Sequence, residues 1–284
     1  MRSEATCGES PVWSSTQSVL YWTDNVERCV HRFDPTSGHD EVFVLDADVM
    51  DIVVRRDGGL LVVTAKSFAW LDPGSGGLRP FAEVEQGLPD NRFNDGKVDR
   101  RGRYWAGSMD GKQWDRPSGV LYRLEPGGEP TPVREGIVCA NGLGWSPDDR
   151  TFYLGESFRH AIFAYDFDLD GGTVSNRRVF AEVGQNGGAF PDGLAVDAEG
   201  GVWSVLNGGG RVVRHAPDGY ATHVVELPVP HPTSCIFGGK HHDTLFITTA
   251  RQGMDEEQLS RYPLSGSVFA LDPGIPGLPE PTYG

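Results

Sequence analysis

A short pattern recurs six times along the chain, and this recurrence restricts the fold more than any other feature. Each copy is a polar or glycine-rich turn followed by an apolar, strand-like segment, as in Asp57-Gly58-Gly59 before Leu60-Leu61-Val62-Val63. A later segment of each unit ends in an acidic turn such as Asp34-Pro35. Steps of 40, 43, 48, 50 and 43 residues separate the markers Trp22, Val62, Trp105, Tyr153, Trp203 and Phe246. A period of about 40 to 50 residues with several strands per unit is typical of a β-propeller. The sequence therefore predicts an all-β fold with six blades around a central tunnel.

The six units cover nearly the whole chain. Its 284 residues include 38 Gly and 20 Pro, which suits many short strands joined by tight turns. A single four-stranded sheet cannot bury both faces, whereas sheets stacked around an axis bury the faces between them. No Pro- or Ser-rich linker interrupts the pattern. We therefore expect residues 1–284 to form a single six-bladed domain, with the N-terminal strand completing the last blade and irregular coil from Pro273 to Gly284.

Composition excludes several classes of partner. The net charge of −15 argues against nucleic acid or an anionic membrane, because both need clustered Lys and Arg. We find no apolar run of 18 residues and no apolar signal segment after Met1, so we expect a cytoplasmic protein without a membrane span. The four cysteines are scattered and form no CxxC pair, so we expect buried, reduced thiols at Cys7, Cys29, Cys139 and Cys235.

Two related segments, Ala140-Asn141-Gly142-Leu143 and Pro191-Asp192-Gly193-Leu194, place a short oxygen-bearing side chain before a glycine at the start of a strand. They lie 51 residues apart, in phase with the blades. Because equivalent positions of a propeller meet at one end of its tunnel, the corresponding oxygen-bearing residues are expected there together. The candidates are Glu9, Asp51, Asn94 or Asp95, Asn141, Asp192 and Ser234. Carboxylate and amide oxygens suit calcium, magnesium or manganese, whereas zinc normally prefers nitrogen or sulfur.

The alternative interpretation is turn chemistry, because Asn-Gly and Asp-Gly are strong turn signals. In both segments, however, the strand follows the motif at once and the turn cluster comes later. The motif therefore stands at the opposite end of the strand from the hairpin, which favours a site at the tunnel mouth.

Longer motifs resemble the regucalcin/gluconolactonase family, also called senescence marker protein. The resemblance runs from Glu9 to about Leu271 and rests on Gly8-Glu9-Ser10-Pro11-Val12-Trp13, Asn91-Arg92-Phe93-Asn94-Asp95-Gly96-Lys97-Val98-Asp99, Leu206-Asn207-Gly208-Gly209, Thr233-Ser234-Cys235-Ile236-Phe237-Gly238-Gly239 and the two segments above. It implies a six-bladed propeller, which agrees with the independent count of six units. It also implies hydrolysis of a sugar lactone, such as glucono- or xylono-lactone, with one divalent metal ion: calcium, zinc, magnesium, manganese or iron.

The resemblance also implies roles for particular residues. Glu9, Asn141 and Asp192 would bind the metal, and Arg92 and Asn94 would hold the substrate's hydroxyl groups. Some members of the family carry an acidic residue three places after a methionine, where this chain has Lys112. Asp110 or Lys112 would take over that contact, and we expect Asp110 to do so. As a mechanistic hypothesis, Asp192 also serves as the general base.

Three other functions are compatible with these residues. A calcium-binding regulatory propeller without catalysis would bind metal but would not need Arg92 and Asn94. A promiscuous metal-dependent esterase is a further alternative, as is a scaffold that only binds other proteins, although a scaffold does not require the convergent oxygens. We expect no catalytic or metal-binding histidine, and we expect packing roles for the recurrent aromatic residues. The oligomeric state expected is a monomer or small homo-oligomer.

Overall fold

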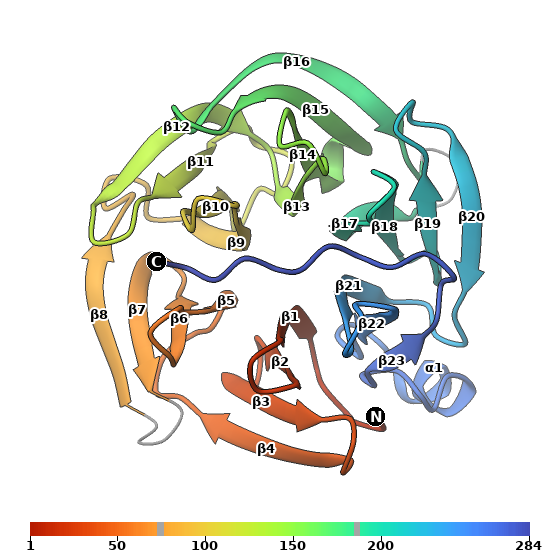
Figure 1. The fold of residues 1–284 in the computed structure, drawn as a ribbon. Helices are drawn as coiled ribbons and strands as arrows, with labels where there is room; N and C mark the ends of the chain where they lie inside the picture. Colours follow the sequence, from red (N-terminus) through yellow and green to blue (C-terminus); the bar gives the residue numbers. More distant parts are fainter. Residues whose placement is uncertain (73–76, 185–187) are drawn as a thin grey trace.

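The computed structural model describes residues 1–72, 77–184 and 188–284, and these form six β-sheets arranged in a ring around a central axis (Figure 1). The six-bladed, all-β propeller predicted from the repeats is thereby confirmed. In each sheet the first strand lies nearest the axis and the chain proceeds outward through antiparallel hairpins. The strands of the first three blades are β1 (Gly8–Ser14), β2 (Val19–Asp24), β3 (Cys29–Asp34) and β4 (His39–Val44); β5 (Asp51–Val54), β6 (Leu60–Val63), β7 (Ser67–Asp72) and β8 (Gly77–Glu83); and β9 (Asn91–Val98), β10 (Tyr104–Asp110), β11 (Gly119–Leu124) and β12 (Pro130–Ile137).

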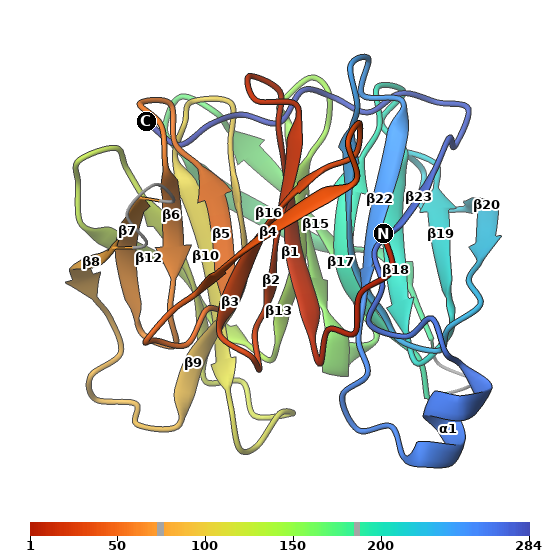
Figure 2. The ribbon, with the colours of Figure 1, turned by 90° about the horizontal axis from the view of Figure 1, so that it is seen from below.

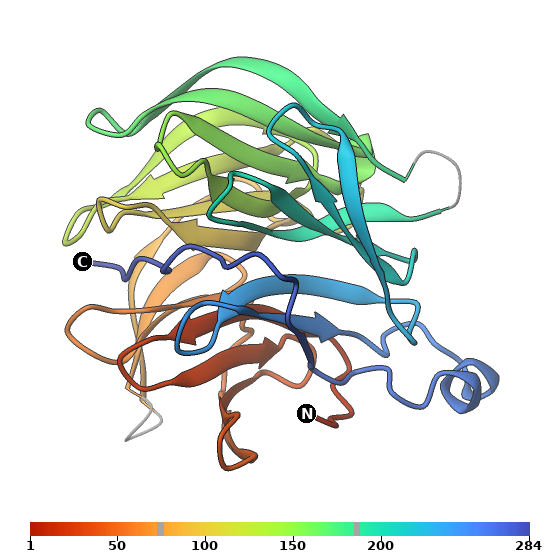
Figure 3. The same ribbon diagram turned by 45° about the vertical axis from the view of Figure 1, so that its right-hand side comes forward.

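The remaining three blades continue the same order, although the sixth sheet has three strands within the described ranges. Short helices contribute little to the fold; η1 (Ser157–Arg159) follows β14, and α1 (Glu256–Arg261) protrudes from the ring between β22 and β23 (Figure 3). The strands are β13 (Ala140–Trp145), β14 (Thr151–Glu156), β15 (Ala161–Asp168) and β16 (Thr173–Glu182); β17 (Phe190–Val196), β18 (Val202–Asn207), β19 (Arg211–His215) and β20 (Ala221–Glu226); and β21 (Pro232–Gly238), β22 (Thr244–Thr249) and β23 (Phe269–Leu271). No helix of the described residues is long and apolar enough to cross a membrane.

The core lies between neighbouring blades. The predicted aromatic markers Trp22, Trp105, Tyr153 and Trp203 are all buried, each in an apolar cluster. In contrast, the outermost strands such as β4 and β20 are largely exposed. The aromatic residues therefore pack the sheets together, as the repeat pattern predicted.

A buried carboxylate fixes the first hairpin of two blades in the same way. Asp99, just after β9, accepts hydrogen bonds from Trp105 Nε1 at 2.8 Å and from Arg103 Nε at 2.7 Å. Asp197, just after β17, accepts them from Trp203 Nε1 at 2.8 Å and from Arg214 Nε at 2.6 Å. Each tryptophan therefore buries its ring between blades while its N–H group remains bonded.

The two ends of the chain close the ring. Backbone bonds join Met1 and Ala5 to Val268 and Gly266, but the N-terminal residues form no fourth strand beside β23 within the described residues, contrary to our expectation. The C-terminal tail is irregular, as expected, yet it is firmly attached. It crosses one end of the tunnel and bonds to several blades, with Tyr283 N donating to Val54 O at 2.9 Å (Figures 1 and 2).

Candidate active site at the tunnel mouth

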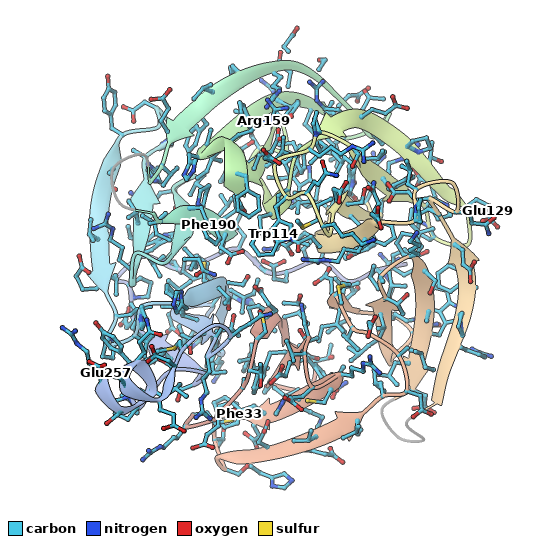
Figure 4. All side chains as sticks on the ribbon, turned by 180° about the vertical axis from the view of Figure 1, so that it is seen from behind. Phe33, Trp114, Glu129, Arg159, Phe190 and Glu257 are labelled. Carbon is cyan, nitrogen blue, oxygen red and sulfur yellow. The ribbon has the colours of Figure 1, made fainter. Side chains whose placement is uncertain are left out.

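A pocket of about 670 Å³ opens at one end of the tunnel. The C-terminal tail runs across the other end, where Glu280 and Pro281 line the inner cavity (Figure 2). The figure seen from this face shows Trp114 and Phe190 close to the axis (Figure 4). Five of the six residues expected to bind metal or substrate line the pocket: Glu9, Arg92, Asn94, Asn141 and Asp192. They come from β1, β9, β13 and β17, the innermost strands of four blades.

Backbone irregularities occur at the same place in five of the six innermost strands. The pairing register shifts between Glu9 and Val12, between Asn141 and Leu143 and between Pro191 and Leu194, and corresponding shifts occur in β9 and β21. A β-bulge bends a strand and changes the direction of its side chains. These bulges accompany the residues that face the axis instead of the neighbouring blade, and the sequence periodicity did not reveal them.

The glycine after each motif residue allows two innermost strands to approach closely. A Cβ atom on Gly142 would lie 2.6 Å from the carbonyl oxygen of Asp192, and Gly142 has a φ of +50°. A Cβ atom on Gly193 would lie 2.1 Å from Ser234 Oγ. Both positions therefore need glycine so that the innermost strands of neighbouring blades can touch. Asn141 and Asp192 consequently lie on adjacent, tightly packed strands.

Asp192 is buried and held by its own hydrogen-bond chain. Asn207 Nδ2 donates to Asp192 Oδ2 at 2.9 Å, and Asn207 Oδ1 lies 3.0 Å from His231 Nδ1. Burial, helped by the charge of Asp95, raises the pKa of Asp192 to about 7, while the hydrogen bond from Asn207 opposes the shift. Burial lowers the pKa of His231. With this pKa, Asp192 can exchange a proton near neutral pH.

Asn141 is oriented by a second chain of bonds. Its Nδ2 donates to Ser157 Oγ at 3.0 Å, and Ser157 Oγ donates to Pro191 O at 2.8 Å. The amide nitrogen is therefore occupied, which leaves Oδ1 of Asn141 as an oxygen donor for a ligand.

Glu9 is a half-buried carboxylate in the same pocket. Its hydrogen bond from the Ser10 N–H group is long, at 3.4 Å. Burial raises the pKa of Glu9 well above its ordinary value, and the nearby charges of Asp192 and Asp95 raise it further. Two carboxylates that repel each other are stabilised by a cation between them.

Arg92 and Asn94 act as a pair. Arg92 Nη1 donates to Asn94 Oδ1 and to Phe93 O, both at 2.9 Å, while Asn94 Nδ2 donates to Ala140 O at 2.8 Å. Asn94 therefore braces the guanidinium against the strand that carries Asn141. Among the described residues the hydrogen bonds of Arg92 all use Nη1, so its other nitrogens can reach a ligand.

Two of the six equivalent positions lie deeper than expected. Asp51 and Ser234 line a narrow cavity of about 30 Å³ farther along the tunnel instead of the main pocket. Asp51 accepts a hydrogen bond from Tyr104 Oη, and burial followed by the charge of Asp95 raises its pKa to about 8. Asp95 lines both spaces and accepts the Gly142 N–H group at 2.6 Å. Asp51 belongs to β5, whose pairing with β6 shows no register shift, whereas Ser234 belongs to β21, which has one.

Asp110 is not among the residues that line the pocket. Its carboxylate accepts the N–H groups of Lys112 and Gln113, both at 2.9 Å, and pairs with Arg116 at 3.4 Å. Lys112 is 75% exposed and pairs with Asp90 at 2.5 Å. The geometry therefore does not support the substrate contact expected of Asp110, because the turn that follows β10 occupies both of its oxygens.

The structure adds pocket residues that the repeat pattern did not predict. Trp114, Phe158 and Phe190 form an aromatic wall, and His231 and Cys7 also line the pocket. Cys7 is partly exposed, whereas Cys29, Cys139 and Cys235 are buried, free thiols as expected. Loop residues have no fixed place in the repeat, so the repeat pattern gave no signal for the wall.

The donor set can be tested for its fit to a metal ion. Among the described residues no three His, Cys, Asp or Glu side chains are grouped to hold one. The expected set of Glu9, Asn141 and Asp192 includes an amide, so only two of its members are of those types. All three offer oxygen, and the mutual repulsion of the two carboxylates suits a hard divalent cation.

The fold and the pocket together define a six-bladed propeller with carboxylates, amides and an arginine at the tunnel mouth. Residues 7–251 match the SMP-30/Gluconolactonase/LRE-like region, and the chain belongs to this family.

Individual relatives match almost end to end. The chain is 35% identical to regucalcin of Oryctolagus cuniculus, covering 98% of this chain and 94% of the relative. It is 36% identical to a 6-deoxy-6-sulfogluconolactonase of Pseudomonas putida, covering 100% and 97%. The crystal structure of a calcium-binding protein, regucalcin, from Agrobacterium tumefaciens superposes with a TM-score of 0.92 at 27% identity, covering 99% and 95%. A gluconolactonase of Xanthomonas campestris gives 0.77 at 25% identity, covering 97% and 88%. At the level of the family, these likenesses support hydrolysis of sugar lactones.

Proposed function

We propose that this protein is a divalent-metal-dependent sugar lactonase that opens an aldonolactone, such as a glucono- or xylono-lactone, to the aldonic acid. The observation that carries the proposal is the convergence of Glu9, Asn141, Asp192 and Arg92 in one pocket of about 670 Å³. Two relatives whose names specify gluconolactone chemistry support the substrate class.

In this proposal Glu9, Asn141 and Asp192 hold the ion. When bound, the ion would polarise the lactone carbonyl and lower the pKa of the attacking water. Asp192 takes one proton from that water while the oxygen of the water bonds to the carbonyl carbon. The hydrogen bond from Asn207 keeps the carboxylate of Asp192 in place. The bond between the carbonyl carbon and the ring oxygen then breaks, and Asp192 returns the proton to the ring oxygen. The product is an open-chain aldonic acid.

Arg92 is suited to hold the substrate while the carbonyl oxygen gains charge. Its free nitrogens offer N–H donors to hydroxyl groups and to the developing negative charge, and Asn94 keeps the guanidinium in place through Nη1. The alternative function, metal-binding regulation without catalysis, does not account for an arginine held in this way.

The proposal is tested with the full chain stripped of metal and reloaded with one ion at a time, in a pH-indicator assay over a panel of lactones. We expect metal-dependent turnover, and Asp192→Ala should lower kcat/KM by about a thousandfold or more, since it removes both base and ligand. Asp166→Ala, at an exposed carboxylate on β15, is the matched control and should retain the activity. Metal binding with no turnover of any lactone would contradict the enzymatic function, and full activity of a folded Asp192→Ala variant would contradict the role of Asp192.

A further inference from the structure

One side of the pocket is an aromatic wall made of Trp114, Phe158 and Phe190. The rings of Trp114 and Phe158 are stacked, with centroids 5.5 Å apart and an interplanar angle of 24°. The rings of Phe158 and Phe190 are 5.6 Å apart at 39°. Trp114 is nevertheless 56% exposed, although it lies at the mouth of a pocket instead of on an outer strand. A large apolar ring left accessible beside a polar centre is a common feature of ligand sites.

The loop that carries Trp114 is held in shape. The indole Nε1 donates to Gly111 O at 3.1 Å, and Gly111 N donates to Asp90 O at 2.8 Å. Asp110 accepts two further N–H groups of the same turn, as described above. The ring is therefore presented to the pocket by a bonded turn, and it needs little additional ordering when a ligand arrives.

The charges around the pocket do not provide for an additional anionic group on a ligand. Among the described residues that line the pocket, Arg92 is the only Lys or Arg, whereas three carboxylates line it: Glu9, Asp95 and Asp192. Burial lowers the pKa of His231, which favours its neutral form. The cations that follow the pocket residues in sequence are already paired with carboxylates: Lys112 with Asp90, Arg116 with Asp110, Arg159 with Glu156 and Arg251 with Glu4.

We propose that this pocket selects uncharged aldonolactones, whose C–H face stacks on Trp114, over lactones that carry a sulfonate or phosphate at the far end of the sugar. The inference rests on the proposed lactonase function and specifies its substrate class. The face of an aromatic ring carries partial negative charge, so it attracts C–H groups and repels an anion. Placing an anion beside it also removes water that no pocket cation replaces.

A different position of the Lys112 side chain would reverse this preference. The pair between Lys112 and Asp90 is exposed, and exposed pairs are weak, so Lys112 could turn to an anionic substituent two residues from Trp114. The experiment therefore includes this lysine.

The test uses the metal-loaded full chain with D-glucono-lactone and with the same lactone phosphorylated at C6. We expect wild-type kcat/KM to favour the neutral lactone by about tenfold or more. Trp114→Ala should raise KM for the neutral lactone about tenfold, change kcat by less than about twofold, and be largely rescued in Trp114→Phe. Tyr220→Ala is the matched control, because Tyr220 is also exposed, at 76%, but lies outside the pocket lining.

Calorimetry with gluconate and 6-phosphogluconate separates this inference from the lactonase function. If no lactone is hydrolysed, the lactonase proposal fails, and tighter binding of gluconate that depends on Trp114 still supports the selectivity. Four results would overturn the inference. The phosphorylated lactone could be used, or 6-phosphogluconate bound, as well as or better than the neutral counterpart, or Lys112→Ala could selectively lose activity or binding toward the phosphorylated ligand. The other two are that neither gluconate nor 6-phosphogluconate binds, or that Trp114→Ala leaves KM and binding unchanged.

Discussion

Single glycines determine how closely the candidate site residues of neighbouring blades approach. Gly142 and Gly193 each follow a proposed metal-binding residue, and each leaves no room for a Cβ atom against the next blade. Gly142 also donates its N–H group to Asp95, so its backbone position is fixed from two directions. Each Asn-Gly or Asp-Gly motif therefore supplies a proposed metal-binding side chain and, at the glycine, the space that the innermost strand of the next blade requires.

Gly142→Ala should lower the free energy of unfolding by about 1–3 kcal/mol and weaken metal binding, because the added methyl group meets Asp192 O and because φ is positive. Urea titration and metal calorimetry measure the two effects. Gly136→Ala is the matched control, since Gly136 also has a positive φ, of +79°, but a Cβ atom there meets nothing within 4 Å. Equal losses in both variants would show that backbone conformation alone, and not the contact between blades, is responsible.

At the level of the element, the innermost strands and the loops contribute different parts of the site. Bulges in β1, β13 and β17 accompany the residues expected to bind metal. The turn after β10 supplies Trp114, and Asp110 holds that turn by accepting two backbone N–H groups. Asp110 therefore belongs to the support of the pocket wall.

Asp110→Ala should loosen this turn and raise KM for the lactone more than it lowers kcat, because the wall is disturbed while the polar centre is kept. Limited digestion with trypsin should cut faster after Lys112, which is exposed in the same turn. Asp34→Ala is the control: Asp34 likewise accepts the backbone N–H groups of Thr36 and Ser37, but in an outer hairpin. Unchanged cleavage and KM in Asp110→Ala would show that the loop does not depend on this carboxylate.

The contribution of the sequence to these findings differs between strands and loops. The period of 40 to 50 residues predicted the six blades, and the register of the innermost strands brought Glu9, Asn94, Asn141 and Asp192 to the mouth. The same register failed for Asp51, whose strand β5 has no register shift, and for Ser234, whose strand β21 has one. The bulges leave no periodic trace in the sequence, and a bulge alone does not bring a side chain to the mouth. Trp114, Phe158 and His231 could not be placed, because connections between strands differ in length from blade to blade.

At the level of the whole molecule, the axis collects buried acidic groups contributed by several blades. Burial and the charges of neighbouring carboxylates raise the pKa of Asp192 to about 7, raise that of Asp51 to about 8, and raise that of Glu9. Burial also raises the pKa of Asp95. The folded protein without metal therefore retains protons that the unfolded chain releases near pH 4.

Stability of the metal-free protein should accordingly fall as the pH rises from about 5 to about 8, because the unfolded state binds fewer protons over this range. Calcium should raise the melting temperature more at pH 8 than at pH 5, since a cation stabilises the ionised carboxylates. Differential scanning fluorimetry in chelator and in calcium measures both trends. A melting temperature in chelator that is constant or rises across this range would contradict the described proton linkage.

The C-terminal tail has a consequence for traffic through the ring. It lies across the end of the tunnel opposite the pocket, and the inner cavity it borders, of about 30 Å³, has room for about one water. A sugar cannot pass through the molecule. Whatever enters the pocket must leave by the same opening. Under the proposed lactonase function, the aldonic acid must therefore leave the pocket before the next lactone can enter it.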